Sequence, residues 1–420
     1  MKITFGLKKI LGREKEGLLR EKWKFDSKNT LLAPPTICDL KNTGEKNILF
    51  GTKEGKIYSL DKNSNIKWIF DAQEQVDQIE IMFLDVESAN SIQASPNIYD
   101  LTGDGRKEIV FGTEMGVVYA LNSEGKPVWK FKAEGSIRGG VIIKDVDGDG
   151  KPEVIFGSGD KNLYILNAKG KLINKFEVDE SIESMPEVMD DKIIFGTNNG
   201  KIHCISFEGE EIWTFKTKDK VLAQPVIGKL FGGDERYIII GSTDQYLYTL
   251  DEQGALIWKF KTEGAIYSKA ALADINNDKK LEIIFGSCDN KVYAVDSRGE
   301  KMWSYETNFW IVAPVIVSDI DDDGNLEIIA GSYDHNLYVL DAKGNYILDY
   351  VPGLAGVMQQ TGSYSDITTS EAGKMTGKKI WQYQTEGIIV GCAMIDETKD
   401  IIINTQKGYV NNIGYEKKRD

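Results

Sequence analysis

The chain has 420 residues, with 65 acidic against 51 basic side chains and a net charge of −14. This acidity argues against a nucleic-acid partner, because binding to a phosphate backbone depends on clustered lysine and arginine. No run of about 18 apolar residues occurs, so we expect no transmembrane segment. Four isolated cysteines without metal-type spacing are expected to be small buried thiols: Cys38, Cys204, Cys288 and Cys392.

A repeated phrase organises the chain: an apolar pair with a Phe-Gly-Ser-like step, a Tyr-rich strand, and a strand ending near Trp. Its glycines are separated by 61, 45, 39, 45, 45 and 45 residues: Gly51, Gly112, Gly157, Gly196, Gly241, Gly286 and Gly331. A period of this size built only from strand-like segments predicts a β-propeller rather than a helical solenoid. One unit shows four strands, over 265–274, 282–287, 291–296 and 301–305, which predicts a four-stranded antiparallel blade.

The ends of the chain predict how the ring closes. After an N-terminal arm over residues 1–17, the segment 21–25 has a fourth-strand pattern with Trp23, although no first strand precedes it. At the other end, 388–395, 401–405 and 408–413 supply three strands. Together they predict an eighth blade, closed by the N-terminal strand, which removes exposed sheet edges. We therefore expect an all-β fold, a single eight-bladed β-propeller over 18–415, with a C-terminal tail over 416–420.

Three departures from the repeat are visible along the chain. Two insertions, 71–90 and 346–376, break the period, and each is interpreted as either a packed or disordered loop or a partner site. Trp381 follows the second insertion and is assigned to blade seven. Asn174 replaces the outer-strand Trp of the third unit, so the rim of that blade is expected to be the most weakly packed.

Four units carry an acidic turn just before the Phe-Gly strand, with oxygen-bearing side chains at positions 1, 3, 5 and 9. A backbone carbonyl at position 7 would complete a site for calcium, which accepts about six to eight oxygen ligands. The sequence therefore predicts up to four calcium ions. The expected ligands are Asp100, Thr102, Asp104, Arg106 and Glu108; Asp145, Asp147, Asp149, Lys151 and Glu153; Asp274, Asn276, Asp278, Lys280 and Glu282; and Asp319, Asp321, Asp323, Asn325 and Glu327.

Three of these loops have glycine at position 6, where the backbone must turn sharply: Gly105, Gly150 and Gly324. An ordinary Asp-Gly turn without metal stays open as the alternative, above all for 274–282, where Lys279 replaces the glycine. Blade one has a degenerate turn with Lys41 at a ligand position, and no metal is expected there.

Two known propeller repeats are similar to these phrases. Residues 117–131, Val-Val-Tyr-Ala-Leu-Asn followed by Gly-Lys-Pro-Val-Trp-Lys-Phe, resemble the repeats of quinoprotein (PQQ-like) dehydrogenases and of the related outer-membrane assembly lipoprotein. The acidic turns followed by Phe-Gly-Ser resemble the FG-GAP repeats of integrin α-subunit propellers, and this resemblance implies calcium between adjacent strands. Both resemblances imply the fold, whereas propellers host many unrelated activities.

Catalysis is poorly supported. The chain has no adjacent Cys pair and its Trp residues are outer-strand copies plus Trp310, so a quinone-dependent dehydrogenase is disfavoured and no PQQ is expected. His203 and His335 are too few for a histidine-based zinc site. The favoured interpretation is a non-catalytic, calcium-binding scaffold for a protein partner. A carbohydrate-binding or polysaccharide-cleaving propeller is the alternative.

The starts of the first strands are expected to ring an axial opening suited to a peptide or a glycan: Gln93, Arg138, Glu183, Gln224, Tyr267, Lys269 and Trp310. An exposed Tyr267 beside Trp310 would favour a glycan. The compartment stays open, because the absence of a signal-like start favours the cytoplasm, whereas weak calcium loops are typical outside cells.

Overall fold

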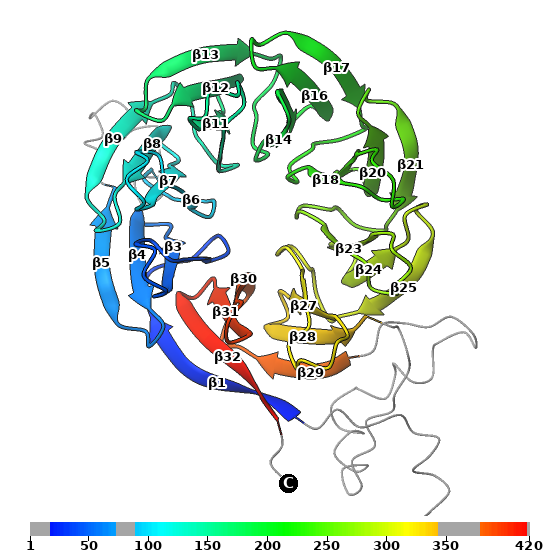
Figure 1. The fold of residues 1–420 in the computed structure, drawn as a ribbon. Helices are drawn as coiled ribbons and strands as arrows, with labels where there is room; N and C mark the ends of the chain where they lie inside the picture. The colour runs from blue at the N-terminus through cyan, green and yellow to red at the C-terminus, as the bar shows by residue number, and fades with distance from the viewer. Residues whose placement is uncertain (1–16, 73–88, 343–378, 418–420) are drawn as a thin grey trace, which may run out of the picture.

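A computed structural model describes residues 17–72, 89–342 and 379–417. Over these ranges, 32 β-strands and no helix form eight four-stranded antiparallel sheets arranged in a ring (Figure 1). The fold is therefore the expected eight-bladed β-propeller. Nearly all of the two insertions at 71–90 and 346–376 falls outside the described residues, as does most of the terminal segments 1–17 and 416–420.

Each blade runs from an inner strand at the centre of the ring to an outer strand at its rim (Figure 1). The inner strands are β2 (Thr36–Cys38), β6 (Asn97–Tyr99), β10 (Val141–Lys144), β14 (Glu187–Met189), β18 (Val226–Gly228), β22 (Ala271–Ala273), β26 (Ile316–Ser318) and β30 (Ile389–Ile395). The second strands are β3 (Asn47–Gly51), β7 (Glu108–Gly112), β11 (Glu153–Gly157), β15 (Lys192–Gly196), β19 (Tyr237–Gly241), β23 (Glu282–Gly286), β27 (Glu327–Gly331) and β31 (Asp400–Thr405).

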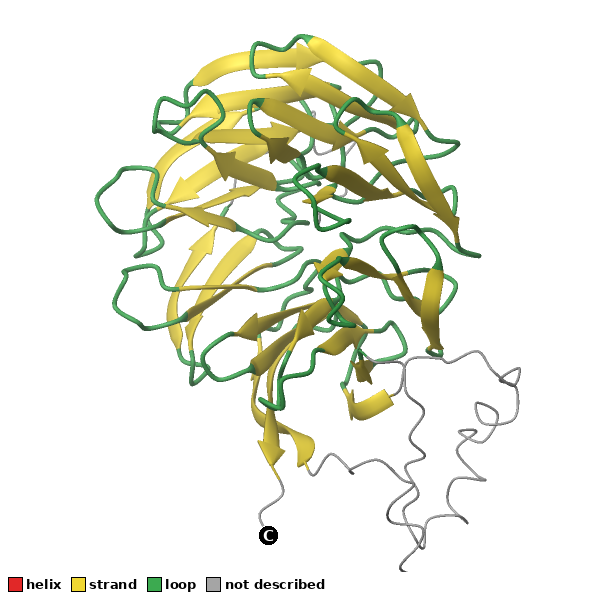
Figure 2. Cartoon of the chain, turned by 45° about the vertical axis from the view of Figure 1, so that its right-hand side comes forward, coloured by secondary structure: helices red, strands yellow, loops and turns green. Residues whose placement is uncertain are grey.

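The third strands are β4 (Lys56–Asp61), β8 (Val117–Leu121), β12 (Asn162–Asn167), β16 (Lys201–Ser206), β20 (Tyr246–Asp251), β24 (Lys291–Val295), β28 (Asn336–Asp341) and β32 (Tyr409–Lys417). The outer strands are β5 (Ile66–Asp71), β9 (Pro127–Lys132), β13 (Leu172–Glu177), β17 (Glu211–Lys216), β21 (Leu256–Lys261), β25 (Lys301–Glu306), β29 (Lys379–Gln384) and β1 (Gly17–Asp26). Strand β1 pairs with β32, so the N-terminal strand completes blade eight as expected, and β29 places Trp381 in blade seven. The strands of each blade twist relative to one another, and Figure 2 shows the blades obliquely, turned by 45° from the view of Figure 1.

The recurring glycine lets one blade approach the next. A Cβ on Gly157 would lie 2.1 Å from Cγ2 of Ile182, the buried residue that leads into the following blade. All seven glycines of the repeated phrase face an Ile or Val in this way. The apolar core accordingly lies between the blades, where clusters combine residues of two neighbouring sheets. The sequence repeat is thus a requirement of packing between blades.

The outer tryptophans join each blade to the next at the rim. The indole N–H of Trp129 donates to the carbonyl of Ala168 at 3.0 Å, and its ring covers Gly170. Trp23, Trp68, Trp213 and Trp258 make the same donor contact, at 2.8–3.1 Å. In blade three, Asn174 keeps a hydrogen bond to the next blade through its amide, which donates to the carbonyl of Phe207 at 3.3 Å. The weaker packing expected at that rim remains a prediction.

The first strand of blade six is shorter than the sequence pattern suggests, whereas that of blade eight, expected over 388–395, spans Ile389–Ile395. In blade six, only Ala271–Ala273 of the expected strand over 265–274 is β-strand. The reason is that the backbone N–H of Ile266 donates to the carbonyl of Ser242 in blade five, at 3.1 Å, instead of joining its own sheet. We call the residues before each inner strand the lead-in segment. The side of the ring that carries these segments is the lead-in face.

Candidate functional site

The four acidic loops lie on the face opposite the lead-in face, because each follows the end of an inner strand and precedes the second strand. We call this side the acidic-loop face. The glutamates at position 9 begin the second strands and are buried, with exposed fractions of 0–3% for Glu108, Glu153, Glu282 and Glu327. Burial of a carboxylate is costly without a compensating partner.

All four loops share one backbone arrangement. In each, the N–H at position 6 donates to the aspartate at position 1, and the N–H at position 2 donates to the glutamate at position 9. In blade three, these bonds join Gly150 to Asp145 at 3.0 Å and Val146 to Glu153 at 3.0 Å. The corresponding distances in the other three loops are 2.8–3.1 Å. The chain therefore forms the same oxygen-lined turn four times.

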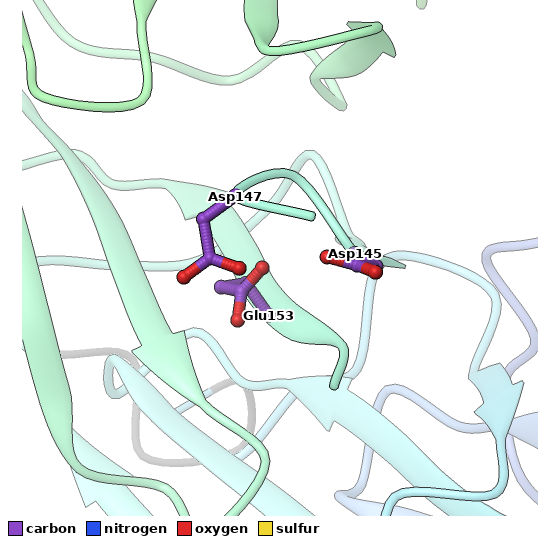
Figure 3. A group of neighbouring side chains, drawn as sticks. All are labelled: Asp145, Asp147 and Glu153. Atoms are coloured by element: carbon purple, nitrogen blue, oxygen red, sulfur yellow. The ribbon is translucent and has the colours of Figure 1, made fainter. Parts of the chain in front are cut away.

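Two loops bring three carboxylates together. Oxygen atoms of Asp145, Asp147 and Glu153 lie within 4.8 Å of one another, and Figure 3 shows these side chains grouped beside the loop. Asp319, Asp321 and Glu327 form the equivalent group in blade seven. An all-oxygen donor set of this density fits a hard divalent cation such as calcium.

The other two predicted loops bring fewer carboxylates together. Position 3 is Thr102 in blade two and Asn276 in blade six. The amide nitrogen of Asn276 donates to Glu282 at 3.1 Å, and its oxygen accepts from the N–H of Asp278 at 2.8 Å. Lys279 takes the glycine position with a φ of +69°, so the turn forms without glycine. These two loops have the same backbone turn as those of blades three and seven, but their carboxylates lie less close together.

The acidic loops carry electrostatic strain when no cation is bound. Burial, followed by the charges of Asp278 and Asp274, raises the pKa of Glu282 to about 7. Burial and neighbouring aspartates also raise the pKa values of Glu108 and Glu153. A bound cation would favour the ionised carboxylates and relieve this strain. The donor set and its electrostatics thus fit calcium, which would supply charge neutralisation and cross-linking of the turn.

The blades without an acidic loop use cationic side chains instead. Arg236 of blade five binds Asp190 of blade four at 2.9 Å and Glu252 at 2.9 Å. In blade eight, the ammonium of Lys22 lies 2.6 Å from buried Asp400. In blade one, the Lys41 ammonium lies 3.0 Å from Glu124 of the next blade.

The seven residues expected at the opening fall into three groups. On blades two to four, Arg138 binds Glu114 at 2.9 Å and Glu183 at 2.9 Å, while Gln93 donates to Glu114 at 2.8 Å. One guanidinium thus bridges two carboxylates, and these contacts link three blades. The hydrogen bond to Glu114 and the nearby charge of Glu183 raise the pKa of Arg138 by more than burial lowers it.

The second group is Gln224 and Lys269, which meet at Glu187; Lys269 and Glu187 line a cavity of about 310 Å³ beside inner strands β14 and β18. Gln224 donates to Glu187 at 3.1 Å, and the ammonium of Lys269, from blade six, lies 3.7 Å from the same carboxylate. The ammonium of Lys144 donates to the carbonyl of Val188 at 2.8 Å. The walls combine cationic and anionic side chains.

The third group is aromatic and lies on blades six and seven. Tyr267 and Trp310 are 39% and 43% exposed. The Trp310 ring centroid lies 5.2 Å from that of Phe309 and 6.4 Å from that of Tyr333. Phe309 is also largely exposed. We call Tyr267, Phe309, Trp310 and Tyr333 the aromatic rim.

Several residues of these groups escaped the sequence interpretation. Glu114 and Tyr333 lie in turns directly after the Gly-Thr and Gly-Ser steps of the repeat, rather than in lead-in segments.

The expectation of four buried thiols is correct for Cys204 and Cys392 and wrong for Cys38 and Cys288, which are partly exposed. Cys288 follows the Gly-Ser step of blade six, a position open to solvent, whereas Cys204 lies in the third strand. Burial still raises the pKa of Cys288, to about 11.

The fold and these surfaces define an eight-bladed β-propeller with oxygen-lined turns on one face and a partly aromatic rim on the other. A family model described as the lambda-carrageenase β-propeller domain matches residues 96–185, 183–270 and 251–352, which together exceed half of the chain. The chain belongs to this family. No curated protein sequence shows significant similarity to it.

Solved structures confirm the architecture. The crystal structure of BamB from Moraxella catarrhalis aligns with a TM-score of 0.63 and 16% identity, covering 94% of this chain and 98% of that chain. The crystal structure of the computationally designed Ika8 protein aligns with a TM-score of 0.65 and 13% identity, covering 96% and 100%. At these identities the likeness concerns the fold alone. Over the described ranges, no helix has the length and apolar character to cross a bilayer.

Proposed function

We propose that the chain is a calcium-stabilised binding propeller. The observation that carries this proposal is the convergence of Asp145, Asp147 and Glu153, whose carboxylate oxygens lie within 4.8 Å of one another at a buried glutamate. Asp145, Asp147, Asp149 and Glu153 would hold the ion with their side chains, and Lys151 with its carbonyl. The equivalent sets of blades two, six and seven would hold up to three more ions. The ions would stiffen the turns between inner and second strands.

Calcium titration of the chelator-treated protein tests this proposal. Because calcium binds the folded state, it should raise the melting temperature as its concentration increases. Isothermal titration calorimetry gives the number of ions, and magnesium serves as the comparison cation because it demands a smaller, more regular site. An unchanged melting temperature at saturating calcium would contradict the proposal.

We further propose carbohydrate as the ligand class, in preference to the protein partner favoured by the sequence alone. Membership of the lambda-carrageenase β-propeller family supports this choice. The first test is retardation of the protein in native gels that contain lambda-carrageenan. Release of new reducing ends from the same polysaccharide distinguishes cleavage from binding, and we expect binding without cleavage. Failure to bind any polysaccharide, together with capture of a defined protein partner, would restore the scaffold interpretation.

A further inference from the structure

The aromatic rim occupies positions at which the other blades carry no aromatic side chain. One backbone hydrogen bond defines these positions, because in every blade the residue after the Ser or Thr of the second-strand turn donates its N–H to a lead-in carbonyl. In blade seven, Tyr333 donates to Trp310 at 2.9 Å. The equivalent pairs are Lys53 and Thr30, Glu114 and Ser91, Gly159 and Ser136, Asn198 and Ser181, Thr243 and Lys220, Cys288 and Ala265, and Gln406 and Ile388.

Seven blades therefore form the same backbone contact without either aromatic ring. The propeller does not need Trp310 or Tyr333 for its fold. Phe309, directly before Trp310, and Tyr267 on blade six extend the same surface. A large apolar side chain that is exposed at a position where packing requires none is a candidate for ligand binding.

The segment that carries Phe309 and Trp310 is held in place by hydrogen bonds. The hydroxyls of Thr307 and Ser332 both donate to the carbonyl of Phe309, at 2.7 and 3.2 Å. The N–H of Asn308 donates to Asp334 at 3.0 Å, and Asp334 also accepts the Tyr338 hydroxyl at 2.6 Å. Exposed rings on a fixed backbone form a pre-organised surface, which lowers the entropic cost of binding.

The contact that the aromatic rim itself offers is uncharged. The guanidinium of Arg138 on the opposite part of the lead-in face is already paired with Glu114 and Glu183. The aromatic rim offers ring faces together with the phenol groups of Tyr267 and Tyr333. A pyranose ring has a complementary character, since one face presents C–H groups and its edge presents hydroxyls.

We infer that the aromatic rim is a saccharide-stacking site, in which a sugar unit packs its C–H face on Trp310 between Tyr333 and Phe309, and the chain continues toward Tyr267. This inference rests on the proposed carbohydrate function and locates it on the face opposite the calcium loops. Loss of such a stacking contact is expected to weaken binding about tenfold, which corresponds to about 1.4 kcal/mol.

Substitution of Trp310 tests the inference in the full-length protein. Trp310→Ala should weaken retardation by lambda-carrageenan about tenfold or more, whereas Trp310→Phe should retain most of the binding. Tyr99→Ala is the matched control, because Tyr99 is 39% exposed, close to the 43% of Trp310, but lies in β6 at the start of an acidic loop. All three variants should keep the melting temperature of the wild-type protein. Polysaccharide binding should also protect wild-type tryptophan fluorescence from acrylamide quenching, and less so in Trp310→Ala.

The outcomes separate the two proposals. If the wild-type protein binds lambda-carrageenan and Trp310→Ala binds equally well, the rim assignment is wrong while the carbohydrate function stands. If Tyr99→Ala loses binding as strongly as Trp310→Ala, the assignment is likewise overturned. If the wild-type protein binds neither lambda-carrageenan nor neutral agarose, but retains hydrophobic peptides in a Trp310-dependent manner, both carbohydrate proposals fail.

Discussion

The indole of Trp129 in blade two lies directly on Gly170 in the neighbouring blade three. A Cβ on Gly170 would stand 2.5 Å from the Cδ2 atom of Trp129, and the glycine has a φ of +72°. This contact is repeated between Trp68 and Gly125, Trp213 and Gly254, and Trp258 and Gly299. It links packing at the rim to a backbone conformation that L-residues rarely adopt.

Gly170→Ala should therefore lower the free energy of unfolding by about 2–4 kcal/mol, through strain at positive φ and overpacking against Trp129. Gly209→Ala provides the matched control, because Gly209 has a φ of +87° but faces the amide of Asn174 at 3.2 Å. It should suffer the strain without the clash, and so lose less. Urea unfolding followed by fluorescence measures both. Equal losses would show that Trp129 can move aside at little cost.

Asp147→Asn should reduce the rise in melting temperature that calcium produces, since it removes one of three converging carboxylates. The control is Asp39→Asn in blade one, where Asp39 accepts the N–H of Gly44 as Asp145 accepts that of Gly150, but the loop carries Lys41 at a ligand position. Asp39→Asn changes basal stability but should leave the calcium-induced shift intact. Calorimetric melting with and without calcium separates the two quantities. A full calcium shift in Asp147→Asn would remove the blade-three loop from the set of metal sites.

Glu282 predicts how ion-free stability depends on pH. Its pKa is raised from 4.5 to about 7 by burial and by Asp278 and Asp274. Because the folded state holds this proton more tightly, the stabilisation is fully present below pH 4.5 and is lost as pH rises through 7. In chelator, the free energy of unfolding should fall by about 3 kcal/mol over this window. Saturating calcium should reverse the fall, and Glu282→Gln should flatten it. An unchanged slope in Glu282→Gln would assign the pH dependence to another group.

Arg236→Gln should destabilise the junction of blades four and five by about 1 kcal/mol, because Asp190 and Glu252 are partly exposed. Arg236 lowers the pKa values of both carboxylates, so its contribution is present above their ordinary pKa values and disappears as the pH falls. Calcium should not change the loss. Arg20→Gln, which removes a more exposed pair with Glu416, should cost less. Calcium rescue of Arg236→Gln would show that an ion can replace the guanidinium.

Most of the fold can be predicted from the sequence, because packing between blades requires particular residues in each repeat. Gly157 must be glycine for Ile182 to approach, so the repeat can be recognised in the sequence. Trp23 carries the outer-strand pattern without a first strand before it, so the closure of the ring can be predicted as well. The boundaries of the inner strands cannot be predicted from the sequence. Ile266 has the apolar pattern of a strand residue, but its N–H joins the neighbouring blade, and alternation does not identify the partner of a backbone group.

The candidate site is only partly encoded in local spacing. The spacing of Asp145, Asp147 and Glu153 predicts their convergence because one tight turn contains them all. Tyr333 and Trp310 are 23 residues apart in sequence and meet only through the register of blade seven. An alignment of the repeats by their Gly-Ser step would have marked Tyr333 as an aromatic residue at an otherwise non-aromatic position.

The pairing of β1 with β32 has a consequence for how the protein is made. The ribosome delivers the N-terminal strand first, yet its partner is the last strand of the chain. During translation β1 stays without its sheet while seven blades are completed, and the ring cannot close until Lys417 has emerged. Closing a loop of this length adds little entropy cost, because that cost grows only with the logarithm of loop length. Ring closure therefore has to wait for the synthesis of β32, and a truncation before that strand prevents it.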